Sequence, residues 1–215
     1  MSQLPAEMFE RIQRTGVVAV LVVDRAEDAV PLAHALLDGR VDVLELTLRT
    51  EAAIDAIRAI KTESPQMIVG AGTVLTVNQV HQAAAAGADF ALAPGMNRAV
   101  VRAAQSAGLP FVPGVVTPSD IERALECECR VLKFFPAEPA GGLTYLKSMA
   151  APYAHLNVRF IPLGGLNAEN AGRYLDDPMI LAVGGSWIAQ RESIAAGDWR
   201  SITALARQAR SLVEK

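Results

Sequence analysis

Eight short apolar segments recur along the chain, separated by longer stretches in which apolar and polar residues follow a helical period. Each segment is rich in Val, Ile, Leu or Phe, and most of them end at Gly or Pro. Such runs are typical of strands that are buried on both faces of a parallel sheet. The predicted strands are residues 17–23, 41–48, 67–72, 90–95, 111–115, 131–136, 158–165 and 180–185.

The stretches between these segments predict helices, because their apolar residues return every three or four positions. Gly39, Gly87 and Gly108 stand where three of the helices should end. The candidate N-cap residues are Thr76 or Asn78, Asn97, Thr117 or Ser119, and Asn167. The predicted helices are residues 26–38, 51–62, 77–87, 98–107, 119–126, 143–151, 168–175 and 198–213.

Eight strands that alternate with eight helices predict an α/β fold, a parallel (β/α)8 barrel of the TIM type. An open doubly wound sheet is the alternative, but GAGT at 70–73 follows the third strand and lacks the next glycine of the dinucleotide fingerprint. No linker or repeat divides the chain, so we expect residues 1–215 to form a single barrel domain. Residues 1–15 predict an extra N-terminal helix that closes the bottom of the barrel.

The composition narrows the environment and the partners of the chain. Hydrophobic residues make up 51% and charged residues 20%, as in ordinary globular proteins. The net charge of −3, with no long basic run, argues against nucleic acid, and no apolar stretch is long enough to predict a membrane span. The N-terminus lacks a signal peptide, and Cys127 and Cys129 lie too close in sequence for a disulfide, so we predict a cytoplasmic protein.

Strand parity places charged side chains inside the predicted barrel. In the second strand, Glu45 and Arg49 share one face, while the leucines share the other face and suit packing under helices. In the sixth strand, Lys133 and Phe135 share a face in the same way. Functional side chains of such barrels stand at the carboxyl ends of the strands. We therefore predict that these residues meet near the upper rim of the barrel.

Glycine turns at the ends of the last two strands predict a place for an anion. Gly164–Gly165 follow the seventh strand and Gly184–Gly185–Ser186 the eighth, where such barrels often bind phosphate through backbone N–H groups. Thr73 and Pro94 stand at the ends of the third and fourth strands. Each signal is weak alone, because paired glycines more often mark a tight turn and a lone threonine more often caps one.

Lys133 has the strongest chemical implication. Burial disfavours the ammonium form of an amine, and a neutral buried amine forms a Schiff base with a ketone. Glu45 would then serve as general acid and base, and Arg49 would bind a carboxylate through two hydrogen bonds. Spacing alone leaves open a lysine that snorkels to solvent, a structural Lys133–Glu45 ion pair and an arginine in a rim salt bridge.

Several stretches resemble the 2-keto-3-deoxy-6-phosphogluconate (KDPG) and 4-hydroxy-2-oxoglutarate (KHG) aldolases. They are VLELTLRTEAAIDAIRAI (43–60), VGAGTVL (69–75), KFFPAE (133–138), GG at 164–165 and GGSW (184–187). The resemblance covers nearly the whole chain in order, and it implies that Lys133 forms the imine while Glu45 moves protons. The predicted substrate-binding residues are Arg49, Thr73, Pro94, Phe135, Leu163, Gly164, Gly165, Gly184, Gly185 and Ser186. Arg49 and Thr73 would hold the carboxylate, and the glycine turns the phosphate.

The resemblance implies a carbon–carbon lyase that cleaves KDPG to pyruvate and glyceraldehyde 3-phosphate. It implies a homotrimer that uses no metal or other cofactor. Cleavage of KHG to pyruvate and glyoxylate is a further expected activity, and a preference for the C4 epimer of KDPG is the alternative. From other classes, a phosphate-binding isomerase would need a second acid or a metal site, and a catalytically silent phosphate-binding barrel would have lost Lys133 or Glu45. His34, His81 and His155 show no metal-ligand spacing.

The chain departs from the family pattern at three positions. Arg40 and Glu128 stand where related enzymes usually carry glycine, at the entry ends of two strands, so they bear on turns rather than on chemistry. Leu163 stands where related enzymes often have threonine, beside the phosphate glycines. The loss of that hydroxyl bears on the substrate preference and not on the type of reaction.

Overall fold

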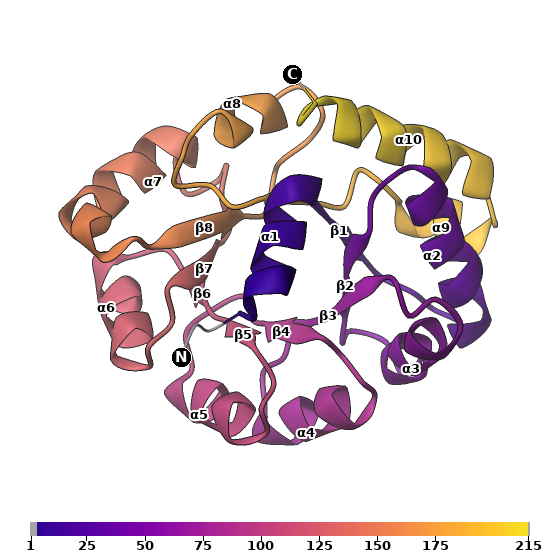
Figure 1. Ribbon diagram of the computed structural model, residues 1–215, viewed down its shortest axis with the longest axis horizontal. Helices are drawn as coiled ribbons and strands as arrows, with labels where there is room; N and C mark the ends of the chain where they lie inside the picture. Colours follow the sequence, from indigo (N-terminus) through magenta and orange to yellow (C-terminus); the bar gives the residue numbers. More distant parts are fainter. Residues whose placement is uncertain (1–3, 215) are drawn as a thin grey trace.

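The computed structural model describes residues 4–214 and contains a curled sheet of parallel strands inside a ring of helices (Figure 1). Six strands pair in the order β5-β4-β3-β2-β1-β9, and three pair in the order β6-β7-β8. The strands are β1 (Val17–Leu21), β2 (Val43–Thr47), β3 (Ile68–Gly72), β4 (Phe90–Leu92), β5 (Phe111–Val112), β6 (Gly114–Val115), β7 (Val131–Phe134), β8 (Arg159–Pro162) and β9 (Val183–Gly185). All eight predicted strand segments are present.

Two seams close the barrel. At the first, β5 and β6 are the halves of one barrel strand, interrupted at Pro113, which has no N–H to donate. The carbonyl of Pro113 still accepts a hydrogen bond of 2.9 Å from the N–H of Lys133, so the pairing with β7 continues. At the second seam, bridges join Phe160 to Ile180 and Leu163 to Gly184. The predicted (β/α)8 barrel is therefore confirmed, and the open doubly wound alternative is excluded.

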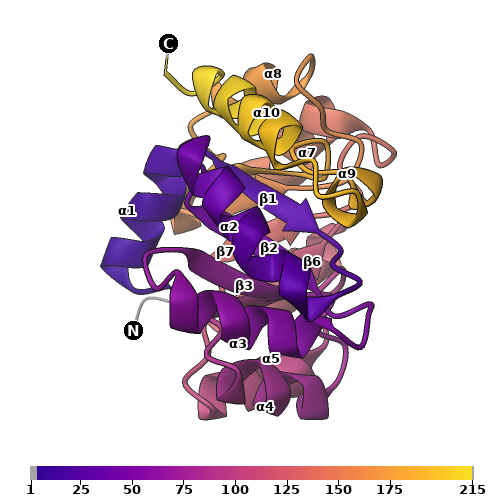
Figure 2. The same cartoon turned by 90° about the vertical axis from the view of Figure 1, so that its right-hand side faces the viewer.

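The helices cover the outside of the barrel, and in Figure 2 α2 and α3 lie against the strands of the first half. They are α1 (Ala6–Thr15), η1 (Ala26–Asp28), α2 (Ala29–Asp38), α3 (Ala53–Glu63), α4 (Val77–Ala85), α5 (Arg98–Ser106), α6 (Pro118–Glu126), α7 (Gly142–Ala150), η2 (Ala151–Leu156), α8 (Ala171–Leu175), α9 (Arg191–Ala195) and α10 (Trp199–Ser211). The sequence pattern did not predict α9 or η2, because neither is long enough to show a helical period. No helix within residues 4–214 has the length and apolar character that crossing a membrane requires.

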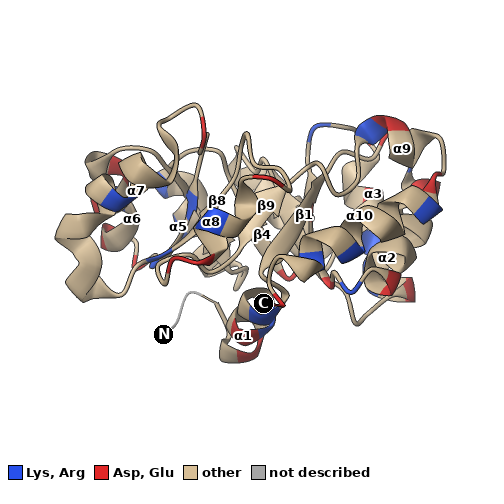
Figure 3. Ribbon diagram, turned by 90° about the horizontal axis from the view of Figure 1, so that it is seen from above, with Lys and Arg blue, Asp and Glu red and all other residues tan. Residues whose placement is uncertain are grey.

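Helix α1 lies across the end of the barrel at which the strands begin (Figures 1 and 3). Leu4 and Ile12 are fully buried there, in the same apolar cluster as the inward residues Val18 and Val43. An ion pair of 2.9 Å between Arg11 and Asp42, which precedes β2, attaches the helix to the barrel. The closing helix is therefore confirmed for its described part, and residues 1–3 of that prediction lie outside the described residues.

Side-chain caps begin several helices as the sequence predicted. Thr76 and Thr117 each form a capping box with the residue three positions later, which settles the two open alternatives. Asn97 accepts hydrogen bonds from two N–H groups of α5. Asn167 accepts from the N–H groups of Glu169 and Asn170, so it caps the turn before α8. The helix predicted at 168–175 therefore begins a few residues later, at Ala171.

Left-handed backbone occurs at two of the three positions where the chain departs from the family pattern. Arg40 has φ 66° and Glu128 φ 60°, and a residue with a Cβ atom is strained in this region. Gly39, Gly87 and Gly108 all stand at helix ends, as predicted; Gly87 and Gly108 are left-handed, whereas Gly39 caps α2 with φ −83°. Gly39 is required for another reason, because a Cβ atom there would overlap the side chain of Ala206 in α10.

Replacing Glu128 tests the strain directly. We expect Glu128→Gly to be more stable than Glu128→Ala by about 0.5–1 kcal/mol. Glycine relieves left-handed strain of about 1–2 kcal/mol but loses more backbone entropy on folding, by about 0.5–1 kcal/mol. Urea denaturation of both variants at one fixed protein concentration measures the difference. A more stable alanine variant would show that any strain in this turn is smaller than the backbone entropy that glycine loses on folding.

Candidate active site

A buried ion pair lies inside the barrel. Lys133 on β7 is 4% exposed and Glu45 on β2 is fully buried, and the Nζ and Oε1 atoms are 3.3 Å apart. The Lys133 ammonium also lies over the ring of Phe135, 5.4 Å from its centroid. The other carboxylate oxygen of Glu45, Oε2, is buried and has no hydrogen-bond partner among the described residues. An unpaired buried acceptor is costly, so this oxygen is available to a molecule that enters the site.

A glycine on the neighbouring strand makes room for the carboxylate. Gly72 is paired with Thr47 in the register of β2 and β3, and a Cβ atom at Gly72 would overlap Oε1 of Glu45. The sequence pattern placed Gly72 at a strand end but did not predict this role, because the contact depends on the register between two strands. The Glu45 side chain therefore reaches Lys133 only because β3 carries no side chain at this position.

The ion pair lies in a cavity of about 410 Å³, to which residues at the carboxyl ends of the strands contribute. All twelve predicted site residues line this one cavity, namely Glu45, Arg49, Thr73, Pro94, Lys133, Phe135, Leu163, Gly164, Gly165, Gly184, Gly185 and Ser186. The sequence analysis missed the other lining residues, which are Val20, Val22, Thr47, Leu166, Ala189, Gln190, Arg191 and Glu192. The inward position of Thr47 could have been inferred, because it shares a strand face with Glu45. Residues 189–192 could not, because they belong to the unpredicted helix α9 or to the two residues before it.

Arg49 is held in place without a carboxylate partner among the described residues. Its Nε donates a hydrogen bond of 3.1 Å to Oγ1 of Thr47, and that hydroxyl donates to the carbonyl of Leu21. Thr73 lies on the same cavity with φ 56°, a left-handed conformation that is rare for a β-branched residue. Such strain is common at ligand-binding positions. The guanidinium of Arg49 is thus oriented and free to pair with an anion.

The two glycine turns adopt shapes that side chains would disturb. Gly164 and Gly165 have φ 96° and 80°, and a Cβ atom on Gly165 would lie 2.7 Å from the side chain of Glu138. At Gly184, a Cβ atom would overlap Leu163, and at Gly185 it would overlap the ring of Trp187. The Trp187 ring therefore packs under the second turn.

Glu138 joins the loop after β7 to the loop after β8, a role that the sequence analysis missed. Its N–H donates to the carbonyl of Gly164 at 3.0 Å. Its carboxylate accepts hydrogen bonds from Arg173, at 2.7 and 2.6 Å, and a short one from the hydroxyl of the fully buried Tyr174. The hydrogen bond from Tyr174 is the main cause that lowers the pKa of Glu138. This cluster therefore fixes the first glycine turn against α8.

The cysteines and histidines lie away from this cavity. Cys127 and Cys129 are buried, free thiols, and burial raises the pKa of Cys129 to about 12. No histidine lines the cavity. Within residues 4–214, no group of three or more His, Cys, Asp or Glu side chains is arranged to hold a metal ion. The expectation that the protein needs no metal stays a prediction.

Fold and site together define an α/β-barrel protein whose strand-end cavity holds a buried amine beside a carboxylate. The family model for KDPG and KHG aldolase matches residues 8–205. The 2-dehydro-3-deoxy-phosphogluconate aldolase of Treponema pallidum is 46% identical over 206 residues, which is 96% of this chain and 97% of that protein. The KHG/KDPG aldolase of Escherichia coli is 46% identical over 201 residues, 93% of each chain.

A solved structure gives the same result. The KDPG aldolase from Legionella pneumophila, with pyruvate captured at low pH as a covalent carbinolamine intermediate, superposes with a TM-score of 0.88. The two sequences are 40% identical, and the match covers 93% of this chain and 96% of that one. The chain belongs to the KDPG and KHG aldolase family, and the resemblance found in the sequence is confirmed.

The Glu138 cluster predicts a pH dependence of stability. Because the folded-state pKa of Glu138 is lowered, its contribution is complete above the unfolded value of about 4.3 and is lost as pH falls through the folded pKa. We expect the wild type to be more stable than Glu138→Gln near pH 7 and this advantage to shrink toward about pH 3.5. Denaturation curves at several pH values measure it. Tyr174→Phe, which removes the main cause of the lowered pKa, should show a weaker pH dependence, and an advantage that stays constant to about pH 3.5 would contradict the assignment.

Proposed function

We infer that the chain is a Schiff-base aldolase that cleaves KDPG, also called 2-dehydro-3-deoxy-phosphogluconate, to pyruvate and glyceraldehyde 3-phosphate. The observation that carries the proposal is the buried Lys133–Glu45 pair in the strand-end cavity of a KDPG and KHG aldolase family member. We include the whole chain, residues 1–215, in one barrel domain.

The reaction begins with the amine of Lys133. Oε1 of Glu45, 3.3 Å away, takes its proton, and the neutral amine attacks the C2 ketone to give a carbinolamine. Glu45 then gives this proton to the C2 hydroxyl of the carbinolamine, which leaves as water, so the carboxylate is restored and a protonated imine forms on Lys133. The protonated imine withdraws electrons from the neighbouring carbons. Glu45 then takes the proton of the C4 hydroxyl, the C3–C4 bond breaks, and the electron pair enters an enamine on Lys133. Protonation of the enamine and hydrolysis of the imine release pyruvate.

The rest of the cavity suits the two ends of the substrate. Arg49, oriented by Thr47, and the strained Thr73 hold the carboxylate next to the reacting ketone. The turns Gly164–Gly165 and Gly184–Ser186 present backbone groups to the phosphate. Pro94 and Phe135 supply apolar surface between these ends.

Leu163 bears on the substrate preference. Its side chain is 3% exposed and packs where Gly184 has no Cβ atom, so it adds an apolar surface to the cavity. A leucine cannot donate a hydrogen bond to the C4 hydroxyl, so the C4 epimer of KDPG stays an alternative substrate. Cleavage of KHG to pyruvate and glyoxylate uses the same lysine and needs no phosphate contact.

The other candidate functions fit the cavity less well. A phosphate-binding isomerase needs a second acid beside the reacting carbons, but the other acid lining the cavity, Glu192, belongs to α9 after the Ser186 turn. A catalytically silent barrel has no use for a buried lysine paired with Glu45, whose Oε2 has no hydrogen-bond partner among the described residues. We retain the homotrimer without metal or other cofactor as part of the proposal, and the cytoplasmic location stays a prediction.

Chemical trapping tests the lysine. Borohydride added with pyruvate should reduce the imine and leave a permanent pyruvate-derived group on Lys133, located by peptide mass spectrometry. Lys133→Met should show no adduct and no cleavage of KDPG, while circular dichroism shows a folded protein. Glu45→Gln should still be trapped, more slowly, because it retains the amine but loses the base. An adduct on another lysine, or none in the wild type, would sink the Schiff-base mechanism.

Arg191 is the third cation that lines the cavity, beside Arg49 and Lys133. It pairs with Asp24 through two hydrogen bonds of 2.7 and 2.5 Å. Both side chains are largely exposed, at 56% and 40%, so the ion pair contributes little to stability and its exchange for a ligand phosphate costs little.

The phosphate role of Arg191 predicts a substrate-dependent defect. Arg191→Gln should raise KM for KDPG about tenfold with little change in kcat, since a charge-assisted hydrogen bond contributes about 1.5–3 kcal/mol. KM for KHG, which carries no phosphate, should stay unchanged. Arg25→Gln is the matched control, because Arg25 pairs with Asp28 and does not line the cavity. Equal losses on both substrates would assign Arg191 a structural role.

A further inference from the structure

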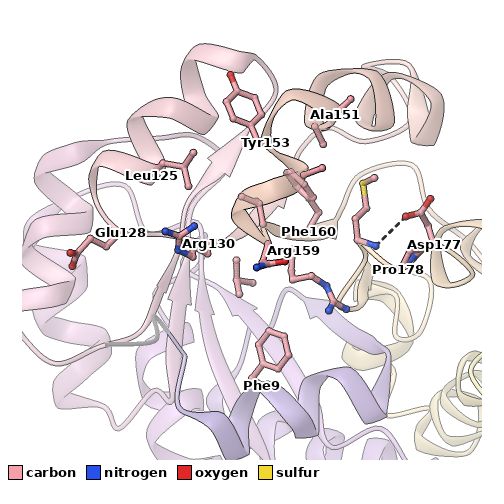
Figure 4. A pocket seen from close by; sticks show the side chains of 16 residues that line it. Phe9, Leu125, Glu128, Arg130, Ala151, Tyr153, Arg159, Phe160, Asp177 and Pro178 are labelled. Atoms are coloured by element: carbon pink, nitrogen blue, oxygen red, sulfur yellow. Dashed lines mark hydrogen bonds between the residues drawn. The ribbon is translucent and has the colours of Figure 1, made fainter.

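A second and larger cavity lies at the opposite end of the barrel from Lys133. Its volume is about 930 Å³, within the usual range of small-molecule sites, about 300–1,000 Å³. Val131 and Arg159, the first residues of β7 and β8, line it. Phe9 of the closing helix α1 also lines it, and Figure 4 shows Phe9 and Arg159 on this cavity. None of its lining residues belongs to the cavity that holds Lys133. The proposed aldolase reaction therefore does not use it.

Arg159 is a partly buried cation on this cavity with no carboxylate partner among residues 4–214. Its Nη2 donates a hydrogen bond of 3.1 Å to the carbonyl of Ile180, and its guanidinium lies 5.8 Å from the centroid of the Phe9 ring. Its Nε is buried and has no hydrogen-bond partner among the described residues. Burial lowers the pKa of Arg159, yet a guanidinium stays charged at neutral pH. No described residue therefore compensates this positive charge or this buried N–H donor.

The acids on the cavity do not neutralise this charge. Asp177 pairs with Lys147 at 2.9 Å and also accepts a hydrogen bond of 3.1 Å from the N–H of Met179. Glu128 is exposed and forms no salt bridge with Arg159. Arg130, whose Nη1 donates to the carbonyl of Leu156 at 2.7 Å, adds a second guanidinium to the lining. The charge of Arg159 therefore favours an anion in this cavity.

Apolar side chains form much of the remaining wall. Phe9, whose ring lies beside the guanidinium of Arg159, supplies aromatic surface, and Tyr153, Phe160 and Met179 also line the cavity. A planar guanidinium pairs with a carboxylate in a fixed geometry, and an adjacent ring favours a ligand with an aromatic or aliphatic body. We propose that this lower cavity binds a small organic carboxylate, which compensates Arg159 while its apolar body packs on Phe9 and Met179.

Benzoate, with benzamide as its neutral analogue of nearly the same shape, tests the proposal. All titrations use the Arg49→Gln variant, so that the proposed carboxylate contact in the upper cavity is removed. Calorimetry should show saturable binding of benzoate and none of benzamide. Benzoate should also raise the unfolding temperature with increasing concentration, because a ligand of the folded state stabilises it by mass action.

Variants of Arg159 locate the site. Adding Arg159→Gln should weaken benzoate binding about tenfold or more, since a charge-assisted hydrogen bond is lost. Arg159→Lys keeps the charge but loses the planar fork, and it should weaken binding by a smaller factor. The lysine variant also keeps the test decisive if the glutamine variant does not fold.

Three results would overturn the proposal. The first is the absence of saturable benzoate binding in the Arg49→Gln protein, and the second is equal binding of benzamide. The third is benzoate binding that both Arg159 variants leave unchanged. If benzoate does not bind and Arg159→Gln changes the oligomeric state in sedimentation experiments, the lower cavity is a contact between copies of this chain and not a ligand site. Trapping of pyruvate on Lys133 is independent of all these outcomes.

Discussion

The burial of one opposite-charge pair, Lys133 with Glu45, constrains the rest of the barrel interior. Removing two charges from water costs several kcal/mol per ion, and close pairing recovers that cost only when the geometry is good. The neighbouring strand β3 has a glycine at position 72, because a larger side chain there would block the Glu45 carboxylate from reaching the amine. The adjacent inward layer is apolar, with Val43 and Ile161 from the same two sheets fully buried. The barrel can hold a buried ion pair because Gly72 leaves room for the carboxylate and apolar side chains fill the space next to the pair.

The buried cations at the two ends of the barrel have different partners. At the carboxyl ends of the strands, Lys133 has a carboxylate partner and a cavity beside it. At the other end, Arg159 has an aromatic ring and a carbonyl but no described carboxylate. The amino-terminal end of such barrels normally serves stability, as do the buried Ile12 of α1 and Leu4 just before it here. Packing alone does not explain why an arginine stands at position 159. An apolar side chain would fill the same space without leaving a buried N–H donor unpaired.

The sequence predicted the barrel and its central pair because both depend on local geometry. Alternation along a strand has a period of two, so the inward placement of Glu45 and Lys133 follows from their own strands. Contacts between distant segments were not predictable in this way. Arg191 meets Asp24 across 167 positions, and Glu138 meets Tyr174 across 36. Neither pair leaves a periodic or compositional signal, and α9, with five residues, is too short to show a helical period.

The packing of Leu163 against Gly184 affects which substrates the cavity can distinguish. Its side chain fills the space that Gly184 leaves on the neighbouring strand, so the two residues are fitted to each other. A site that hydrogen-bonds a substrate hydroxyl rejects a substrate lacking that contact by about 10⁴–10⁵, whereas an apolar wall discriminates by only about 10–200-fold. With leucine at this position, recognition of the C4 hydroxyl cannot come from this wall. In the proposed mechanism Glu45 takes the proton of that hydroxyl, so the carboxylate that breaks the bond also has to sense the configuration at C4.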